Sequence, residues 1–184
     1  MTFLRQLPVL TLLCVLISGV FSGAQAQQQV PLNIAIVNID KILGTAAAPK
    51  SILAQIKQIR DTYRQEVQKE EEALRQANQE LAQKQSLLSP EAFKEERRKF
   101  EQNVLAVQKK VQQKNLSLQN AKQEAQNQVQ SALRDVVLEI SKEKGYTLVL
   151  RRNQTVIVAD PLDITDQVIA ALDKKLPKVT VSPK

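Results

Sequence analysis

The sequence predicts an α+β fold, mainly α, in which a long antiparallel coiled-coil helical hairpin projects from a small β-containing oligomerisation body. Residues 51–144 contain no glycine and a single proline, Pro90, and strong helix formers dominate them. Apolar residues recur along this segment in steps of three and four, which is the period of a coiled coil. Apolar runs rich in β-branched residues flank it on both sides and are typical of buried strands.

The N-terminus has the pattern of a cleaved signal peptide over residues 1–26. Arg5 supplies the positive start, residues 7–21 form the apolar stretch, and Ala24-Gln25-Ala26 fits the small-x-small cleavage site. An uncleaved membrane anchor is the alternative, but the unbroken apolar run covers only residues 9–17, whereas a spanning helix needs about 20 apolar residues. We therefore expect export and cleavage.

Cleavage would remove the only cysteine, Cys14, and the only methionine. Leucines precede Cys14 where a lipoprotein signal requires small residues, which argues against a lipid anchor there. The mature chain would have no His or Trp either, and a net charge of +6, because Arg5 is the one charged residue in the leader. A moderate positive charge suits unfolded polypeptide, lipid headgroups or nucleic acid. Export makes nucleic acid the least natural of these partners.

The start of the mature chain predicts a strand and a short helix. Residues 32–39 are apolar and β-branched, which favours a buried strand, and residues 40–44 form a brief helical turn that stops at its glycine. Residues 45–50 are expected to be a connection, with Thr45 or Ser51 as the cap of the following helix.

The long helical segment predicts two antiparallel arms, 51–88 and 91–144; one kinked rod is the alternative. Between the arms, Ser89 can cap a new helix and Pro90 suits its first position. Each arm carries a narrow apolar seam that needs a partner, which favours the hairpin. We expect the tip at this break, near residues 88–91.

The seam follows a seven-residue repeat with two extra four-residue steps. It is thin, because charged residues interrupt it and alanine fills much of it. The first arm contributes Ile52, Ile56, Ile59, Tyr63, Val67, Glu70, Leu74, Ala77, Leu81, Lys84 and Leu88, and the second contributes Phe93, Arg97, Phe100, Val104, Val107, Val111, Lys114, Leu118, Ala121, Ala125, Val129, Ala132, Val136 and Ile140.

The two arms differ in length. At 1.5 Å per residue the first is about 57 Å long and the second about 81 Å, so they cannot pair throughout. The surplus at the end of the second arm has a wider apolar face, which we expect to enter the body. That face contains Val129, Leu133, Val136, Val137, Leu138 and Ile140.

The C-terminal part predicts more strand and one more helix. Residues 146–150 and 155–159 predict two strands joined by a turn, after a glycine that ends the second arm. Asp163 or Thr165 can cap the final helix, and the tail 177–184, with its two prolines, is expected to fray. The apolar side of the final helix consists of Ile164, Val168, Ile169, Leu172 and Leu176.

The predicted body combines residues 27–50 and 145–184. It has about 64 residues, one aromatic side chain and no disulfide, so its core is marginal alone and oligomerisation is the simplest remedy. The apolar strand residues that we expect in the oligomer body are Ile34, Ile36, Val37, Leu148, Val149 and Leu150.

The order of these segments resembles the Skp/OmpH family of periplasmic chaperones over nearly all of the mature chain. The likeness rests on IAIVNID at 34–40, the Lys/Gln/Glu-rich hairpin, YTLVL at 146–150 and ADPLDITDQVIAAL at 159–172. The resemblance implies a homotrimer with a central β-body and three hairpins around a cavity. It also implies a periplasmic holdase that binds unfolded outer-membrane proteins, and a contact with lipopolysaccharide through basic residues.

The residues themselves predict no catalysis, no metal and no cofactor. A mature chain without His or Cys excludes nucleophiles and metal sites built on imidazole or thiolate, and no glycine-rich phosphate loop is present. The densest acidic cluster, Glu70-Glu71-Glu72, would point in three directions on a helix, because successive residues lie about 100° apart. We therefore expect a binding protein that works without ATP.

Candidate client contacts lie at the tip and on the second arm. Leu87, Leu88 and Phe93 sit by the tip, where they would cap the seam of the hairpin or touch clients. Residues 102–123 contain four lysines and no acid, which predicts either a solvated face or a contact with clients or headgroups. These lysines are Lys109, Lys110, Lys114 and Lys122.

Two other functions remain open at this point. An exported coiled-coil scaffold or spacer would carry a denser seam and a surface anchor. A lipid-surface adaptor would bind through net charge, with no need for a client. The polar residues within the seam, and the loss of any anchor on cleavage, favour the holdase.

Overall fold

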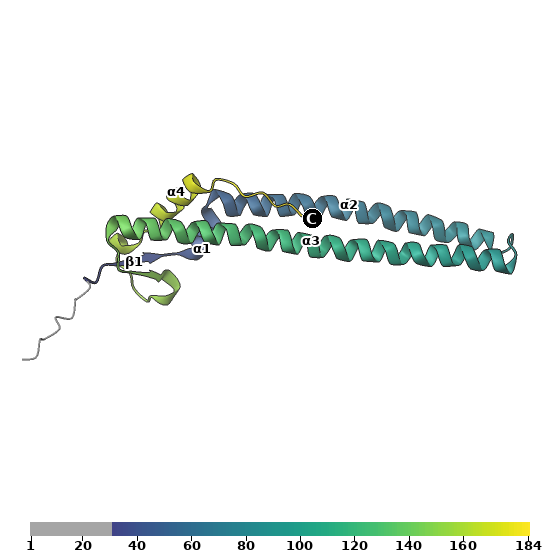
Figure 1. The fold of residues 1–184 in the computed structure, drawn as a ribbon, viewed down its shortest axis with the longest axis horizontal. Helices are drawn as coiled ribbons and strands as arrows, with labels where there is room; N and C mark the ends of the chain where they lie inside the picture. Colours follow the sequence, from purple (N-terminus) through teal and green to yellow (C-terminus); the bar gives the residue numbers. More distant parts are fainter. Residues whose placement is uncertain (1–30) are drawn as a thin grey trace, which may run out of the picture. The chain divides into compact units, whose positions relative to one another are not determined.

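The computed structural model describes residues 31–184, so the predicted signal peptide at 1–26 lies outside the described residues. Figure 1 shows two long helices side by side, with β1, α1 and α4 near the end opposite the tip. The predicted fold class, mainly α with a helical hairpin and a small strand pair, is confirmed. In chain order the elements are β1 (Ile34–Val37), α1 (Ile39–Thr45), α2 (Ala47–Lys84), α3 (Pro90–Lys144), β2 (Leu148–Arg151), 3₁₀ turns at Arg152–Gln154 and Asp160–Leu162, and α4 (Thr165–Lys175).

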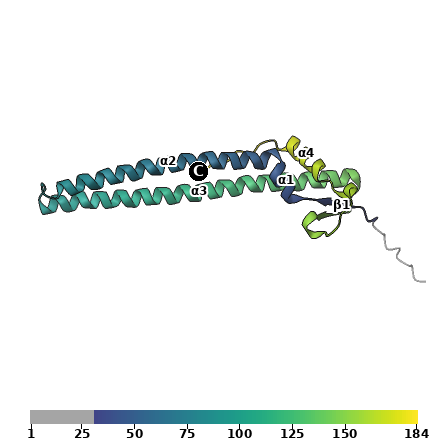
Figure 2. The ribbon, with the colours of Figure 1, turned by 180° about the vertical axis from the view of Figure 1, so that it is seen from behind.

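The break between α2 and α3 forms a hairpin and not a kinked rod, as Figure 2 also shows. Ser89 Oγ accepts a hydrogen bond from the backbone N–H three residues on (3.3 Å), and Pro90 is the first residue of α3, as predicted. α2 ends at Lys84, four residues before the predicted end. The N–H of Leu88 donates to the Lys84 carbonyl (3.0 Å) and closes the tip turn.

α2 begins at Ala47, four residues before the predicted start, so the prediction of a connection at residues 47–50 is wrong. The Ala47 N–H donates to Asp173 Oδ1 of α4 (2.7 Å), and this distant carboxylate takes the place of both predicted capping residues. Pro49 is tolerated because it lies in the first turn, where its missing N–H would have no helical partner. α1 also continues one residue past the predicted stop at Gly44.

The predicted seam faces inward along the hairpin and into the body, with one exception. Every predicted seam residue is buried or half-buried except Arg97, which is exposed, and Glu96 takes the inward place. From Phe93 to Phe100, a step of three followed by four passes through Glu96, and a step of four followed by three passes through Arg97. The spacing of apolar residues alone therefore cannot tell which of the two faces inward. Across the hairpin, Glu96 Oε2 lies 2.8 Å from Lys84 Nζ, and within α3 Lys99 Nζ lies 2.9 Å from Glu96 Oε1.

The core of the body lies where α3 extends beyond α2, as the difference in length predicts, but Leu138 of the predicted apolar face is 51% exposed and does not enter the core. There the end of α3 packs against β1, α1 and α4, so both ends of the described chain contribute to one core. The buried cluster consists of Ala35, Val37, Ile42, Ala46, Leu133, Val136, Ile164, Val168 and Leu172.

β1 and β2 pair in parallel, with Ile34 opposite Leu148. The predicted strand at 155–159 does not form, so the predicted β-hairpin is wrong. A 3₁₀ turn follows β2 instead, and Val156 and Ile157 are 97% and 89% exposed. A strand needs a neighbour that takes its backbone hydrogen bonds, and in the described part of the chain none pairs with this segment.

The C-terminal tail, residues 177–184, is not frayed, contrary to the prediction. Val179 and Val181 are 3% and 6% exposed and pack against α2 and α3. Gln55 of α2 makes hydrogen bonds to the backbone of both valines. Figure 1 shows the tail running along α2 to the C-terminus.

The two segments that carry the family resemblance meet at Thr165, which is 2% exposed. Its Oγ1 accepts a hydrogen bond from the Asn38 N–H (2.8 Å), and its hydroxyl donates to Asp163 Oδ1. The neighbouring Ile164 N–H donates to the Ile36 carbonyl (3.0 Å). One hydroxyl therefore joins the end of β1 to the start of α4.

Replacing this hydroxyl tests its contribution. We expect T165V to lower the free energy of unfolding by about 1–3 kcal/mol, because the Asn38 N–H loses its acceptor in a partly buried place. Urea unfolding followed by circular dichroism measures the change. T165S keeps the hydroxyl, so its free energy of unfolding should fall clearly less. An equal fall in both variants would show that the methyl group, not the hydroxyl, contributes the stability.

The ion pair near the tip predicts an acid-sensitive hairpin. The hydrogen bonds from Lys84 and Lys99 lower the pKa of Glu96 from its ordinary value of 4.5 to about 2. Because the pKa is depressed in the folded state, this stabilisation is complete above pH 4.5 and is lost as the pH falls toward 2. We expect E96Q to flatten the acid-induced loss of helix in that window, measured by circular dichroism. E124Q, at an exposed glutamate of α3, is the control, and matching titrations of E96Q and wild type would contradict the prediction.

Candidate functional site

Two faces of the hairpin are defined by side chains that point in opposite directions from α2. Gln55 and Leu53 are two residues apart and therefore lie about 200° from each other around the helix. Gln55 contacts the C-terminal tail, and we call its side the tail face. Leu53 lines a hollow on the other side, which we call the groove face.

Three adjoining hollows form a continuous groove along the groove face. The hollow nearest the body has a volume of about 320 Å³, the next about 790 Å³, and the one toward the tip about 720 Å³. The first two share Ile56 and Lys122, and the second and third share Val67 and Gln119. The apolar side chains that line the groove are Leu43, Ile52, Leu53, Ile56, Tyr63, Val67, Leu74, Val104, Val107, Val111, Leu116, Leu118 and Val129.

The groove combines this apolar floor with amide side chains along one wall. Gln108, Gln112, Asn115 and Gln119 line it in steps of four, three and four along α3. An amide both donates and accepts hydrogen bonds, so this row can bond the backbone of an extended chain that lies in the groove. The sequence-based prediction placed the valines in the seam but missed the groove. The amides repeat with the period of the seam, and that repeat is the signal that could have found it.

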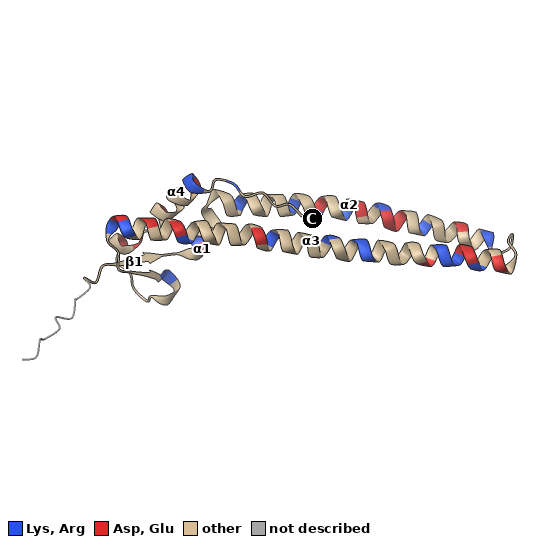
Figure 3. Ribbon diagram, in the orientation of Figure 1, with Lys and Arg blue, Asp and Glu red and all other residues tan. Residues whose placement is uncertain are grey.

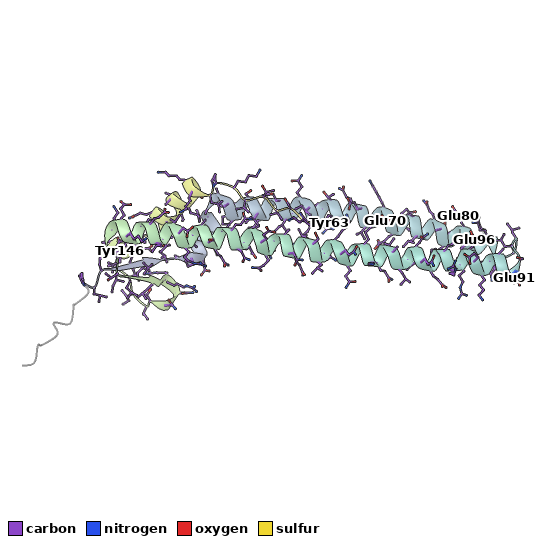
Figure 4. All side chains as sticks on the ribbon, in the orientation of Figure 1. Tyr63, Glu70, Glu80, Glu91, Glu96 and Tyr146 are labelled. Atoms are coloured by element: carbon purple, nitrogen blue, oxygen red, sulfur yellow. The ribbon has the colours of Figure 1, made fainter. Side chains whose placement is uncertain are left out.

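On the tail face, ion pairs fasten the two helices together. Lys114 bonds Glu66, and Lys110 bonds Glu70. The Lys114 Nζ also lies 4.3 Å from the ring centroid of Tyr63, and Figure 4 labels Tyr63 and Glu70 along α2. The hydrogen bond from Lys114 lowers the pKa of Glu66, and the bond to Glu70 raises the pKa of Lys110. Lys114 and Glu70, which interrupt the seam, thus each pair with an oppositely charged residue of the other helix.

The four lysines predicted as client contacts do not form one patch. Figure 3 shows acidic and basic residues intermixed along both helices. Lys110 and Lys114 face acids of α2, Lys109 is exposed, and Lys122 lines the groove. The local excess of positive charge on α3 is therefore partly neutralised within the hairpin.

The three apolar candidates lie at the tip, apart from the groove. Leu87 is 80% exposed, whereas Leu88 and Phe93 are half-buried at the end of the seam. The groove ends nearer the middle of the hairpin, at Leu74 and Val104. Tip and groove are two separate apolar surfaces.

The acidic cluster of α2 has no shared centre. Glu70 faces Lys110, Glu71 lines the groove, and Glu72 bonds Arg75. Within residues 31–184, no group of carboxylates, imidazoles or thiols is placed to hold a metal ion. No helix of this range is both long and apolar enough to cross a membrane.

The six strand residues expected in the oligomer body divide between two sides of the sheet. Val37 and Val149 pack into the chain's own core. Side chains alternate along a strand, so the other four lie on the opposite side, where Leu148 is 40% exposed. Those four are Ile34, Ile36, Leu148 and Leu150.

Comparison with known proteins places this architecture in a family. Residues 33–172 match the family model of outer membrane protein (OmpH-like). A crystal structure from Caulobacter crescentus CB15 that carries the name outer membrane chaperone (OmpH-like) has the same fold, with a TM-score of 0.76 and 22% sequence identity. The alignment covers 83% of this chain and 90% of that one. No curated protein matches the chain. Because the family model spans β1, the hairpin, β2 and most of α4, the chain belongs to the OmpH-like family.

Proposed function

We propose that this protein is an ATP-independent holdase chaperone of the periplasm that binds unfolded outer-membrane proteins and prevents their aggregation. The observation that carries the proposal is the continuous groove, with its apolar floor and its row of amides, open along the hairpin. The name of the similar Caulobacter structure, outer membrane chaperone, supports the same class of function. The signal-peptide pattern supports export to the periplasm.

The groove favours many weak contacts over one tight one. Toward the tip its floor consists largely of valines, which are small enough to accept varied apolar side chains without a fixed fit. Each contact is weak, but contacts made together by one client chain add through their high effective concentration. Such binding is reversible and needs no nucleotide, so a client can leave when its own folding is more favourable.

A homotrimer, with the hairpins of three subunits around a cavity, completes the proposal. Within the described residues the sheet has only two strands, and segment 155–159, which follows β2, has no partner strand there. Val156 and Ile157 expose nearly all of their side chains to solvent. Strand pairing between subunits would satisfy this backbone and bury these side chains.

The remaining candidate contacts complete the client surface. Leu87, Leu88 and Phe93 would hold apolar client segments at the tip. Lys109 and Lys122 are available to acidic client segments or to the phosphates of lipopolysaccharide. Lys110 and Lys114 would first have to leave Glu70 and Glu66, so we expect them to contribute less.

The holdase is tested by light scattering as a urea-unfolded outer-membrane barrel protein is diluted into buffer with residues 27–184. We expect aggregation to be suppressed at a few-to-one molar excess, and less well at high salt if the lysines contribute. L116D, which places a charge on the groove, should need several-fold more protein for the same effect. L105D is the matched control, because Leu105 is similarly exposed on α3 outside the groove. Unchanged aggregation at every ratio, with folded protein, would reject the holdase and favour the scaffold.

The trimer is tested by the exposed segment after β2. We expect I157D to shift the mass measured by multi-angle light scattering from trimer toward monomer, because a charge would have to be buried between subunits. N153D, in the turn just before this segment, should leave the mass unchanged. A monomeric wild type, or a trimeric I157D, would contradict this interface.

A further inference from the structure

The tail lies along the tail face of the hairpin, with side chains that are alternately buried and exposed. Val179 and Val181 are buried, whereas Thr180 and Ser182 between and beyond them are exposed, which is the alternation of a β-strand. The floor beneath the valines is a depression between α2 and α3, in which alanines leave room for them. Its residues include Ala48, Ile52, Ile56, Leu118, Ala121 and Ala125.

Gln55 recognises the backbone of the tail much as a neighbouring strand would. Its Nε2 donates to the Val179 carbonyl (2.7 Å), and its Oε1 accepts from the Val181 N–H (3.0 Å). Gln55 is itself held in place, because its Nε2 also donates to Ser51 Oγ (3.0 Å). At the far end, the Ser117 hydroxyl donates to the Lys184 carbonyl. Apart from the packing of the two valines, these contacts involve only main-chain atoms of the tail.

The recognition is therefore of a pattern and not of a particular sequence. It requires apolar side chains at alternate positions and a free carbonyl and N–H on the residues that carry them. Strands of transmembrane β-barrels have this alternation along their whole length. The family match ends at residue 172, so the tail lies beyond it, whereas the floor and Gln55 lie within it.

We propose that this depression, the tail groove, is a peptide-binding site for extended segments with alternating apolar residues, and that the tail is its resident occupant. The identification of the ligand with unfolded barrel strands rests on the proposed function. The tail is tethered, so it occupies the site at high effective concentration, and a client that also binds elsewhere on the hairpin can displace it.

The test uses a fluorescein-labelled peptide copying residues 177–184 (PKVTVSPK) and the full chain, with binding measured by fluorescence anisotropy. The variant V179D/V181D removes the resident tail, because both charges would have to be buried. T180D/S182D is the matched control, since it places the same two charges on exposed positions of the tail. We expect V179D/V181D to bind the peptide at least tenfold more tightly than wild type or T180D/S182D.

Two further measurements identify the site. Adding Q55A to V179D/V181D should abolish binding, and a peptide with aspartate at both valine positions should not bind. Equal affinity for the two peptides, or no binding to V179D/V181D with an unchanged circular dichroism spectrum, would overturn the proposal.

A measurement on the unmodified chain covers the case in which V179D/V181D does not fold. Unfolded barrel protein should speed amide hydrogen exchange in residues 177–184 of wild type, because displacement frees the Val181 N–H from Gln55. Unchanged exchange, while the same mixture still resists aggregation, would reject the tail groove and leave the holdase intact.

Discussion

A helix that packs against a single neighbour can bury only a narrow stripe of its surface, and this limit determines how little of the hairpin is buried. From residue 57 to residue 117 no side chain is fully buried. Ion pairs such as Lys84–Glu96 and Lys114–Glu66 therefore help hold α2 and α3 together where apolar burial is weak. For the same reason the valines toward the tip line an open hollow. Burial becomes complete only near the body, where the tail and α4 add a third layer.

Features set by neighbouring residues could be predicted from the sequence. Ser89 and Pro90 begin α3 as their local chemistry requires, and Gly145 ends it with a φ of 70°, a conformation that glycine adopts without strain. The seam was predictable because the position of a residue along a helix determines the face of the helix on which it lies. Its one error, Arg97 in place of Glu96, lies where two spacings fit equally well and only the partner helix decides.

Features set by distant residues could not be predicted. The start of α2 depends on Asp173, and the order of the tail depends on Gln55, each more than 120 residues away in sequence. Residues 155–159 have the composition of a strand, but the described part of the chain offers them no partner strand, so composition alone misled. The groove was missed because spacing shows which residues turn inward, whereas a hollow depends on how far small side chains reach across the gap between the helices.

The parallel pairing of β1 with β2 has a consequence for how the chain folds. Ile34 and Leu148 lie opposite each other although 114 residues separate them, and nearly all of the intervening chain is the hairpin. Closing an unstructured loop of that length would cost about 4 kcal/mol of chain entropy. The hairpin forms from contacts nearer in sequence, and once it is complete its two ends lie much nearer each other than the ends of an unstructured loop of that length would. We therefore expect the arms to assemble before the sheet, and β1 to wait unpaired until most of the protein has been synthesised.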